Sequence, residues 1–153
     1  MKKLVMLKTA AVLLITAALM AVAWAWWSWS PRGSMVSGNG YTGLIRSYGD
    51  ARWTPPKQTI MMLEADLKAF LSSDESLRGS RLASEPDRFW REYGGYEKAG
   101  SRFVSIAFLH QDHISRRTFL NGVMVDGGGD FYWYALYEVE KRTFTRISHN
   151  GPM

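Results

Sequence analysis

The sequence contains no cysteine, and this absence excludes three classes of protein. A lipoprotein attached through a thiol, a disulfide-stapled scaffold and a site built on thiolate ligands or a thiolate nucleophile all require cysteine. The compartment is left open, because exported bacterial proteins often lack disulfides.

Acidic residues are also missing from the first thirty positions, whereas Lys2, Lys3 and Lys8 lie there. The net charge is +5, and setting these lysines aside leaves 16 of the 19 basic residues against 14 acidic ones. That balance is ordinary for a folded domain, and the sequence shows no clustered basic face of the kind that phosphate binding requires. We therefore expect no nucleic-acid partner.

Residues 9–29 contain no charged side chain, and as a helix these 21 residues would span about 30 Å, the thickness of a bilayer's hydrocarbon core. Indole rings favour the headgroup layer, and the end of the segment carries Trp24, Trp26, Trp27 and Trp29. These features favour a retained anchor that partners the inner membrane. A cleaved signal peptide is the alternative, because small residues have cleavage-site spacing in Ala21-Val22-Ala23 and Ala23-Trp24-Ala25.

Both alternatives keep the lysines in the cytoplasm and export the remainder of the chain. The predicted location is the bacterial inner membrane, with a single span and a C-terminal domain in the periplasm, or the secreted or periplasmic space after cleavage. The domain boundaries follow from composition: residues 1–30 are the anchor or signal, 31–40 a flexible linker rich in small polar residues, and 41–153 one exported domain.

Apolar periodicity predicts one long helix in the exported domain. The helix begins at Pro55-Pro56 and repeats apolar residues at helical spacing, namely Ile60, Leu63, Leu67, Phe70 and Leu71. A short first strand is expected at residues 41–49. A short helix is expected between Ser84 and Gly94-Gly95, with Phe89, Trp90 and Tyr93 buried.

Four β-rich runs separated by short turns complete the domain, at Arg102–His110, Phe119–Asp126, Phe131–Glu140 and Thr143–His149. We therefore predict an α+β fold in which the long and short helices pack on a four- to five-stranded antiparallel sheet, as in cystatin-like and NTF2-like domains. This comparison is topological and implies no function.

Three polar residues with metal-ligating side chains, His110, Asp112 and His113, end the first of these runs. A catalytic zinc site needs three converging ligands, but residue 113 would point away from the face shared by 110 and 112. We interpret this segment as a polar surface loop. His149 is the only other histidine, so we predict no catalytic residues, no metal ligands and no cofactor.

Asp126 and Asp130 flank three consecutive glycines. Calcium prefers six to eight oxygen ligands, which two carboxylates do not supply. We predict a hairpin loop in which the glycines adopt positive φ and the aspartates cap the turn.

Alternation along residues 131–140 places apolar side chains on both faces of one strand. One face carries Phe131, Trp133, Ala135, Tyr137 and Val139, and the other carries Tyr132, Tyr134 and Leu136. One long helix cannot cover both faces, so the second must meet the short helix, a second subunit, a ligand or the membrane. Covering by the short helix is the simpler alternative. The sharper hypothesis is a binding surface formed by Tyr132, Trp133 and Tyr134.

An aromatic pattern runs through residues 85–151 and consists of Trp90, Tyr93, Asp126-Gly127-Gly128, Tyr132, Trp133, Tyr137, Phe144 and Asn150-Gly151. In this pattern the chain resembles a group of small exported bacterial proteins of unknown function, which share an Asp-Gly-Gly aromatic hairpin and a terminal Asn-Gly. The resemblance implies export and one α+β domain. It implies no activity, substrate or cofactor.

The sequence therefore predicts a membrane-anchored or secreted periplasmic binding or interaction module, with an envelope protein as the expected partner. Two alternatives stay open. One is a small metal-dependent hydrolase that uses His110, Asp112, Asp126 or Asp130, and the other is a structural component of the envelope. The sequence indicates no oligomeric state.

Overall fold

The computed structural model describes residues 16, 19–20, 33–47, 53–123 and 125–151. The chain divides into two units, Met1–Ser30 and Pro31–Met153, and the strands belong to the second. The predicted membrane segment, residues 9–29, lies outside the described residues except for Thr16, Leu19 and Met20, which are helical. No helix within the described ranges has the length and apolar character that a membrane crossing requires.

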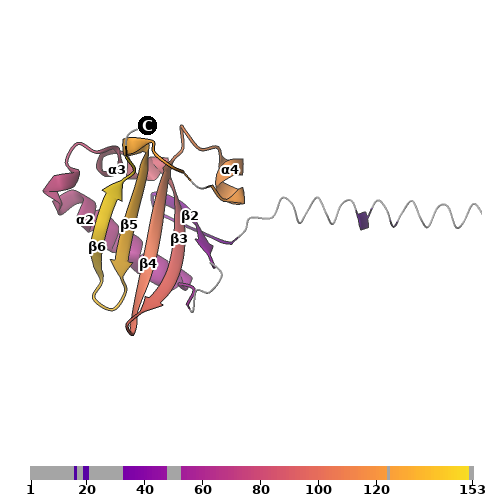
Figure 1. Ribbon diagram of the computed structural model, residues 1–153, viewed down its shortest axis with the longest axis horizontal. Helices are drawn as coiled ribbons and strands as arrows, with labels where there is room; N and C mark the ends of the chain where they lie inside the picture. Colours follow the sequence, from indigo (N-terminus) through magenta and orange to yellow (C-terminus); the bar gives the residue numbers. More distant parts are fainter. Residues whose placement is uncertain (1–15, 17–18, 21–32, 48–52, 124, 152–153) are drawn as a thin grey trace, which may run out of the picture. The chain divides into compact units, whose positions relative to one another are not determined.

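Six strands form one mixed sheet in the order β1-β2-β3-β4-β5-β6 (Figure 1). Their bounds are β1 Ser34–Gly38, β2 Tyr41–Arg46, β3 Phe89–Lys98, β4 Ser101–His110, β5 Tyr132–Glu138 and β6 Thr143–His149. Neighbouring strands are antiparallel except β2 and β3, which are parallel. Parallel neighbours need a crossover connection, and helix α2 (Lys57–Ser73) lies in the segment that connects these two strands.

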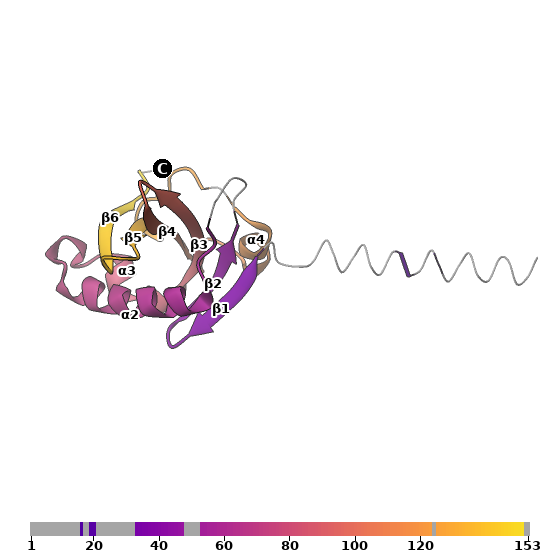
Figure 2. The ribbon, with the colours of Figure 1, turned by 90° about the horizontal axis from the view of Figure 1, so that it is seen from below.

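Helix α2 lies along one face of the sheet and supplies the main core (Figure 2). It follows Pro55-Pro56, as predicted, and its buried side chains recur at helical spacing: Thr59, Ile60, Leu63, Glu64 and Leu67. They pack against the sheet residues Tyr93, Val104, Ile106, Phe108, Trp133, Ala135 and Tyr137. The predicted α+β class and long helix are therefore confirmed.

The short helical elements lie in the connections. They are η1 Glu75–Leu77, α3 Arg81–Ser84, η2 Pro86–Arg88, α4 Arg116–Asn121 and η3 Gly129–Phe131. Helix α4 lies over the face of the sheet opposite α2, where Phe119 joins a second core with Leu44, Leu109 and Ile114. The two faces of the sheet are therefore covered unequally.

The predicted short aromatic helix is wrong, because its residues form β3. All ten residues of β3 pair with β4, from Phe89↔His110 to Lys98↔Ser101. The glycine pair that resembled a helix end lies inside the strand, where Gly95 allows close approach: a Cβ there would lie 2.6 Å from Pro55 Cδ. Ser84, which was predicted to start that helix, is the last residue of α3, and Pro86 begins η2.

The strand predicted at Phe119–Asp126 is also wrong, because α4 and a loop occupy this segment. Ser115 caps α4 by accepting a hydrogen bond from the Thr118 amide, and Gly122 follows the helix with a φ of 86°. This Ser-x-x-Thr start and glycine end are helix signals that outweigh the apolar content of Phe119 and Leu120.

Residues 34–38 were expected in a flexible linker but form β1, which pairs with β2 from Ser34↔Ile45 to Gly38↔Tyr41. Asn39-Gly40 joins the two strands, and this dipeptide is the strongest short hairpin signal in a sequence. The sheet therefore has six strands and one parallel pair, rather than four to five antiparallel strands.

Candidate functional site

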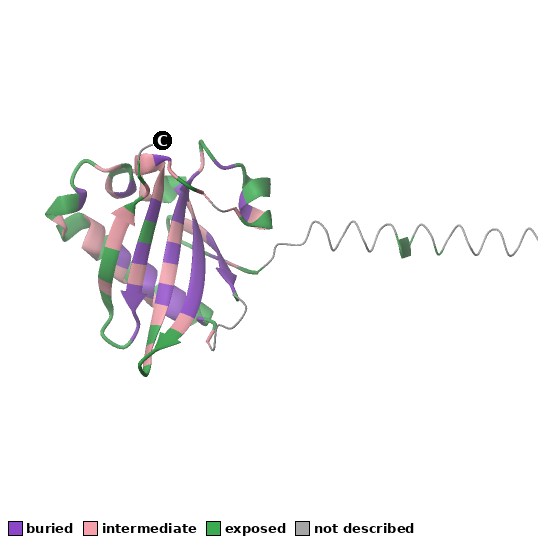
Figure 3. Cartoon of the chain, in the orientation of Figure 1, coloured by how far each residue is buried: buried purple, intermediate pink, exposed green. Residues whose placement is uncertain are grey.

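Strand β5 divides its side chains between the two faces of the sheet as the alternation predicts. Trp133, Ala135 and Tyr137 are buried on the face that α2 covers. Tyr134 points to the opposite, outer face and is 54% exposed, the one exposed position on this strand (Figure 3). An exposed aromatic side chain in the middle of a sheet is the first indication of a binding surface.

The three residues predicted to bind a partner do not share one surface. Tyr132 lies on the outer face but is partly buried against the core under α4. The side chain of Trp133 lies on the α2 face, 5% exposed, and its indole N–H donates to the carbonyl oxygen of Asp130 at 2.9 Å. Of the three predicted residues, Tyr134 is therefore the one that solvent reaches freely.

Two clefts adjoin Tyr134 on the outer face, with volumes of about 480 Å³ and 470 Å³. Tyr134 and Asn150 line both of them, so the clefts meet at these residues. We call the two clefts together the outer groove. The first cleft includes Arg46, Glu92, Leu109, Asn121, Val125 and Tyr132, and the second includes Tyr96, Ser105, Leu136, Arg146 and Ser148.

Strand register explains why the outer face is hollow beside Tyr134. Ala107 of β4 lies directly opposite Tyr134, and Ser105 lies opposite both Leu136 and Gly94. These small side chains lie between the larger groups on β5 and those on β2 and β3. Residues of five strands, β2 to β6, line the outer groove.

The wall of the first cleft contains a buried ion pair. Arg46 Nε lies 2.9 Å from Glu92 Oε2, and the two residues are 6% and 9% exposed. The Arg46 guanidinium also donates to the carbonyl oxygen of Phe119 at 2.8 Å, which connects the sheet to α4. The opposite charges compensate each other, so this wall adds no net charge to the groove.

The second cleft has a different charge. Its lining contains Arg146, an exposed side chain of β6, and no carboxylate. Register places Arg146 opposite Leu136 and Ser148 opposite Tyr134. The second cleft therefore combines tyrosine rings, serine hydroxyl groups, the imidazole of His149 and the guanidinium of Arg146.

The loop of three glycines borders the groove but is not the predicted hairpin. Gly127, Gly128 and Gly129 have φ values of 82°, 95° and 54°, so the expected left-handed conformations are confirmed. Asp130 accepts from the Arg81 amide at 2.9 Å. The loop is held by Asn150, whose side-chain amide donates to the carbonyl oxygens of Val125 and Gly127, each at 3.1 Å.

The histidine segment does not form the predicted surface loop at residue 110. His110 is fully buried, with its ring edge-on to Phe89 at 4.8 Å between centroids. Its Nδ1 accepts the Asp112 amide at 3.3 Å, and its Nε2 lies 3.3 Å from a Glu85 oxygen. Burial follows from the strand pairing of His110 with Phe89, which carries the ring into the end of the core.

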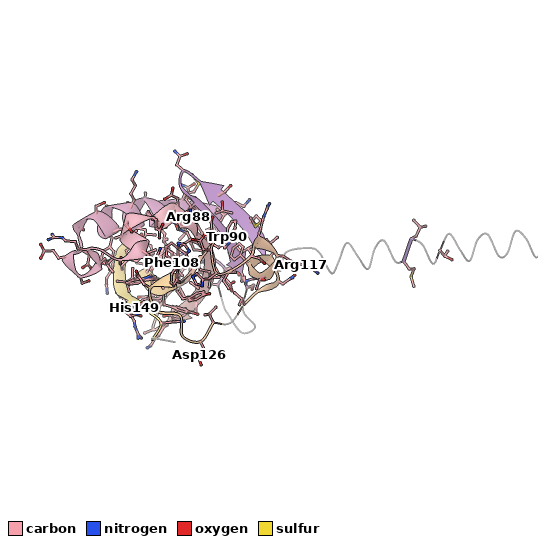
Figure 4. All side chains as sticks on the ribbon, turned by 90° about the horizontal axis from the view of Figure 1, so that it is seen from above. Arg88, Trp90, Phe108, Arg117, Asp126 and His149 are labelled. Atoms are coloured by element: carbon pink, nitrogen blue, oxygen red, sulfur yellow. The ribbon has the colours of Figure 1, made fainter. Side chains whose placement is uncertain are left out.

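Of the residues considered for a hydrolase, His110 and Asp112 lie together, with His110 Nδ1 3.8 Å from Asp112 Oδ2. Asp112 pairs with Arg88, and Figure 4 shows Arg88 and Asp126 at opposite sides of the domain. His113 instead packs on Phe131, with ring centroids 3.9 Å apart. The described part of the chain contains no group of three or more His, Cys, Asp or Glu side chains placed to hold a metal ion.

Two polar networks that the sequence did not reveal tie α2 to the sheet. In the first, Glu64 pairs with Arg91 at 3.0 Å and accepts from the Tyr93 hydroxyl at 2.6 Å. Burial raises the pKa of the Glu64 carboxyl and raises the pKa of Tyr93 well above its ordinary value. These groups lie within the core under α2, so we interpret them as structural.

The second network joins α2 to the β5–β6 hairpin. Asp66 accepts from the Tyr137 hydroxyl at 2.5 Å and from Arg142 Nη2 at 2.6 Å. The Arg142 hydrogen bond is the main cause of a lowered Asp66 pKa, and burial, followed by the Asp66 contact, raises the pKa of Tyr137 to about 12.

The outer groove is the strongest candidate site on geometry alone. Comparisons with protein-family models, with curated proteins and with solved structures found no match.

Proposed function

We propose that this chain is a binding module whose outer groove holds an extended segment of an envelope protein. The observation that carries the proposal is Tyr134, which is 54% exposed between two adjoining clefts on the sheet face that α2 does not cover. Aromatic side chains with both apolar and polar parts are typical anchors of protein interfaces.

The size and layout of the outer groove favour an extended chain as the occupant. Each cleft has a volume within the range of about 300–1,000 Å³ that small-ligand sites show. An extended chain points alternate side chains to one face, so successive side chains of this kind would enter the clefts on the two sides of Tyr134.

We further propose that residues 9–29 hold the protein in the inner membrane with the domain in the periplasm, or direct it there before cleavage. The absence of charge from this segment and the lysines before it support this location. Mass spectrometry of the mature N-terminus, combined with membrane fractionation, separates the anchored form from the cleaved form. A full-length chain recovered in the cytosol would contradict both.

Site-specific photo-crosslinking tests the binding face. We would place p-benzoylphenylalanine at residue 134 or residue 61 of the full chain in cells. Met61 is a matched control because it is also 54% exposed but lies on α2, on the other side of the sheet. We expect an adduct of defined mass from residue 134 and none from residue 61.

A groove-filling variant gives the second arm of this experiment. Ala107→Trp places an indole on the floor beside residue 134, and Ser148→Trp does the same from β6. We expect either variant to abolish the adduct while the far-UV circular dichroism stays unchanged. Equal adducts from residues 134 and 61, or an adduct that persists in both folded variants, would contradict the proposal.

A further inference from the structure

Arg146 differs from most arginines of the domain in its electrostatic environment. A carboxylate pairs with each of Arg46, Arg78, Arg81, Arg88, Arg91, Arg102 and Arg142. Arg146 makes no ion pair with any residue in the described ranges, although it belongs to a strand of the sheet and lines the second cleft. The charge of its guanidinium is therefore available to a ligand in that cleft.

The outer groove as a whole presents a positive charge beside an apolar surface. The first cleft contributes the compensated pair of Arg46 and Glu92, and the second contributes Arg146 without a carboxylate. Leu136 of β5 lies directly opposite Arg146, and Tyr134 lies two residues farther along β5. A planar guanidinium binds a carboxylate through two parallel hydrogen bonds, which gives direction as well as attraction.

We infer that the segment held in the outer groove is acidic, with a carboxylate on Arg146 and an apolar side chain against Tyr134. The inference rests on the proposed function of the groove and adds the chemistry of its occupant. Charge complementarity argues for the carboxylate, and the exposed ring of Tyr134 and the partly exposed Leu136 argue for the apolar neighbour. Arg146 is then a residue that determines specificity.

Three synthetic peptides probe this chemistry. Each is a fluorescein-labelled dodecapeptide with the sequence Gly-Leu-Ser-Xaa repeated three times, in which Xaa is Glu, Gln or Lys, so that the Leu and Xaa side chains point to the same face of an extended chain. Their affinities for the full chain in detergent are measured by fluorescence anisotropy at low salt. We expect the Glu peptide to bind about fivefold more tightly than the Gln peptide, the upper range for an exposed ion pair. The Lys peptide should bind most weakly.

The charge reversal Arg146→Glu is the decisive variant. We expect it to reverse the order of the peptides, so that the Lys peptide binds best. Lys68→Glu is its matched control, because Lys68 is an exposed cation on α2 and the substitution changes the net charge equally. This control should weaken the Glu peptide slightly and keep the original order.

Several outcomes would overturn the inference. They are equal affinities for the three peptides, a Glu preference that survives Arg146→Glu, and no binding of the Glu peptide. Binding of phosphatidylglycerol vesicles that requires Arg146, without any peptide preference, would assign the site to a lipid headgroup instead. The crosslink at residue 134 tests whether the outer groove binds a partner, and the peptides test whether that partner is acidic. A crosslink without a Glu preference would therefore contradict this inference alone.

Discussion

Ala107 and Tyr134 lie directly opposite each other on β4 and β5, and the methyl group of Ala107 leaves one side of the tyrosine ring open. This pairing creates the outer groove, because a larger residue at position 107 would fill the hollow. Tyr134 is therefore exposed because its neighbour on β4 has a small side chain. Tyr132 and Tyr134, the two outer-face tyrosines of β5, should accordingly respond differently to substitution.

Tyr134→Ser should change the free energy of unfolding by no more than about 0.5 kcal/mol, as is usual for an exposed side chain. Tyr132→Ser should cost about 1–3 kcal/mol, because its ring packs on the core under α4 and against Gly128. Thermal unfolding of the two variants gives the comparison, with Met61→Ser as the exposed control. Equal destabilisation by both serine variants would show that Tyr134 belongs to the core.

The alternation along β5 was sufficient to predict Tyr134, because it depends only on the period of one strand. The rest of the groove depends on register between strands. Ala107 lies opposite Tyr134, and Arg146 opposite Leu136, only once β4, β5 and β6 are aligned. No local pattern in the sequence contains that information.

Local sequence signals explain why the short helix and one strand were predicted wrongly. Pro86 and the pair Gly94-Gly95 resemble the start and end of a helix, yet the ten residues of β3 pair along their whole length with β4. Phe119 and Leu120 resemble a strand, but Ser115 and Gly122 are the start and end of α4. In both segments, tertiary pairing or capping decided between two plausible local structures.

Asn150→Asp should loosen the glycine loop that borders the first cleft. A carboxylate lacks the amide hydrogens that Asn150 donates to Val125 and Gly127, so both carbonyl oxygens lose their donor. We expect a loss of about 1–3 kcal/mol in stability. Hydrogen exchange of the Gly129 amide, which donates to the Gly151 carbonyl at 3.1 Å, should accelerate. Unchanged exchange at Gly129 would contradict a clamp by Asn150.

Asp66→Asn should remove part of the acid sensitivity of the domain. The folded-state pKa of Asp66 lies below its ordinary value of 3.8, chiefly because Arg142 donates to it. The folded state therefore binds fewer protons than the unfolded state, and stability falls as the pH drops through and below 3.8. Unfolding temperatures at pH 6 and pH 2.5 should differ less for the variant than for the native chain. A larger difference for the variant would reverse the assigned sign.

Tyr137→Phe should reduce the loss of stability at alkaline pH. The pKa of Tyr137 is raised from 10.0 to about 12, so the folded state retains a proton that the unfolded state loses. This contribution is full below pH 10.0 and is lost as the pH rises toward about 12. The native chain should lose more stability than the variant between pH 9 and pH 11.5. Parallel losses, measured by urea unfolding, would show that the hydroxyl does not titrate as assigned.

Gly95→Ala should destabilise the domain for reasons of space alone. The backbone of Gly95 is not in the left-handed region, but an added Cβ would lie 2.6 Å from Pro55 Cδ and 2.7 Å from the Trp53 carbonyl oxygen. Backbone and a proline ring cannot move aside as a flexible side chain can, so we expect a loss of about 1–3 kcal/mol.

Gly151→Ala provides the control, because nothing lies within 4 Å of a Cβ at that position. It should leave the unfolding temperature unchanged. If Gly95→Ala is equally neutral, residues 53–55 do not press on β3 as closely as the structure shows. In that case the glycine pair would have no packing role, and the segment leading into α2 would not be fixed on the sheet by this contact.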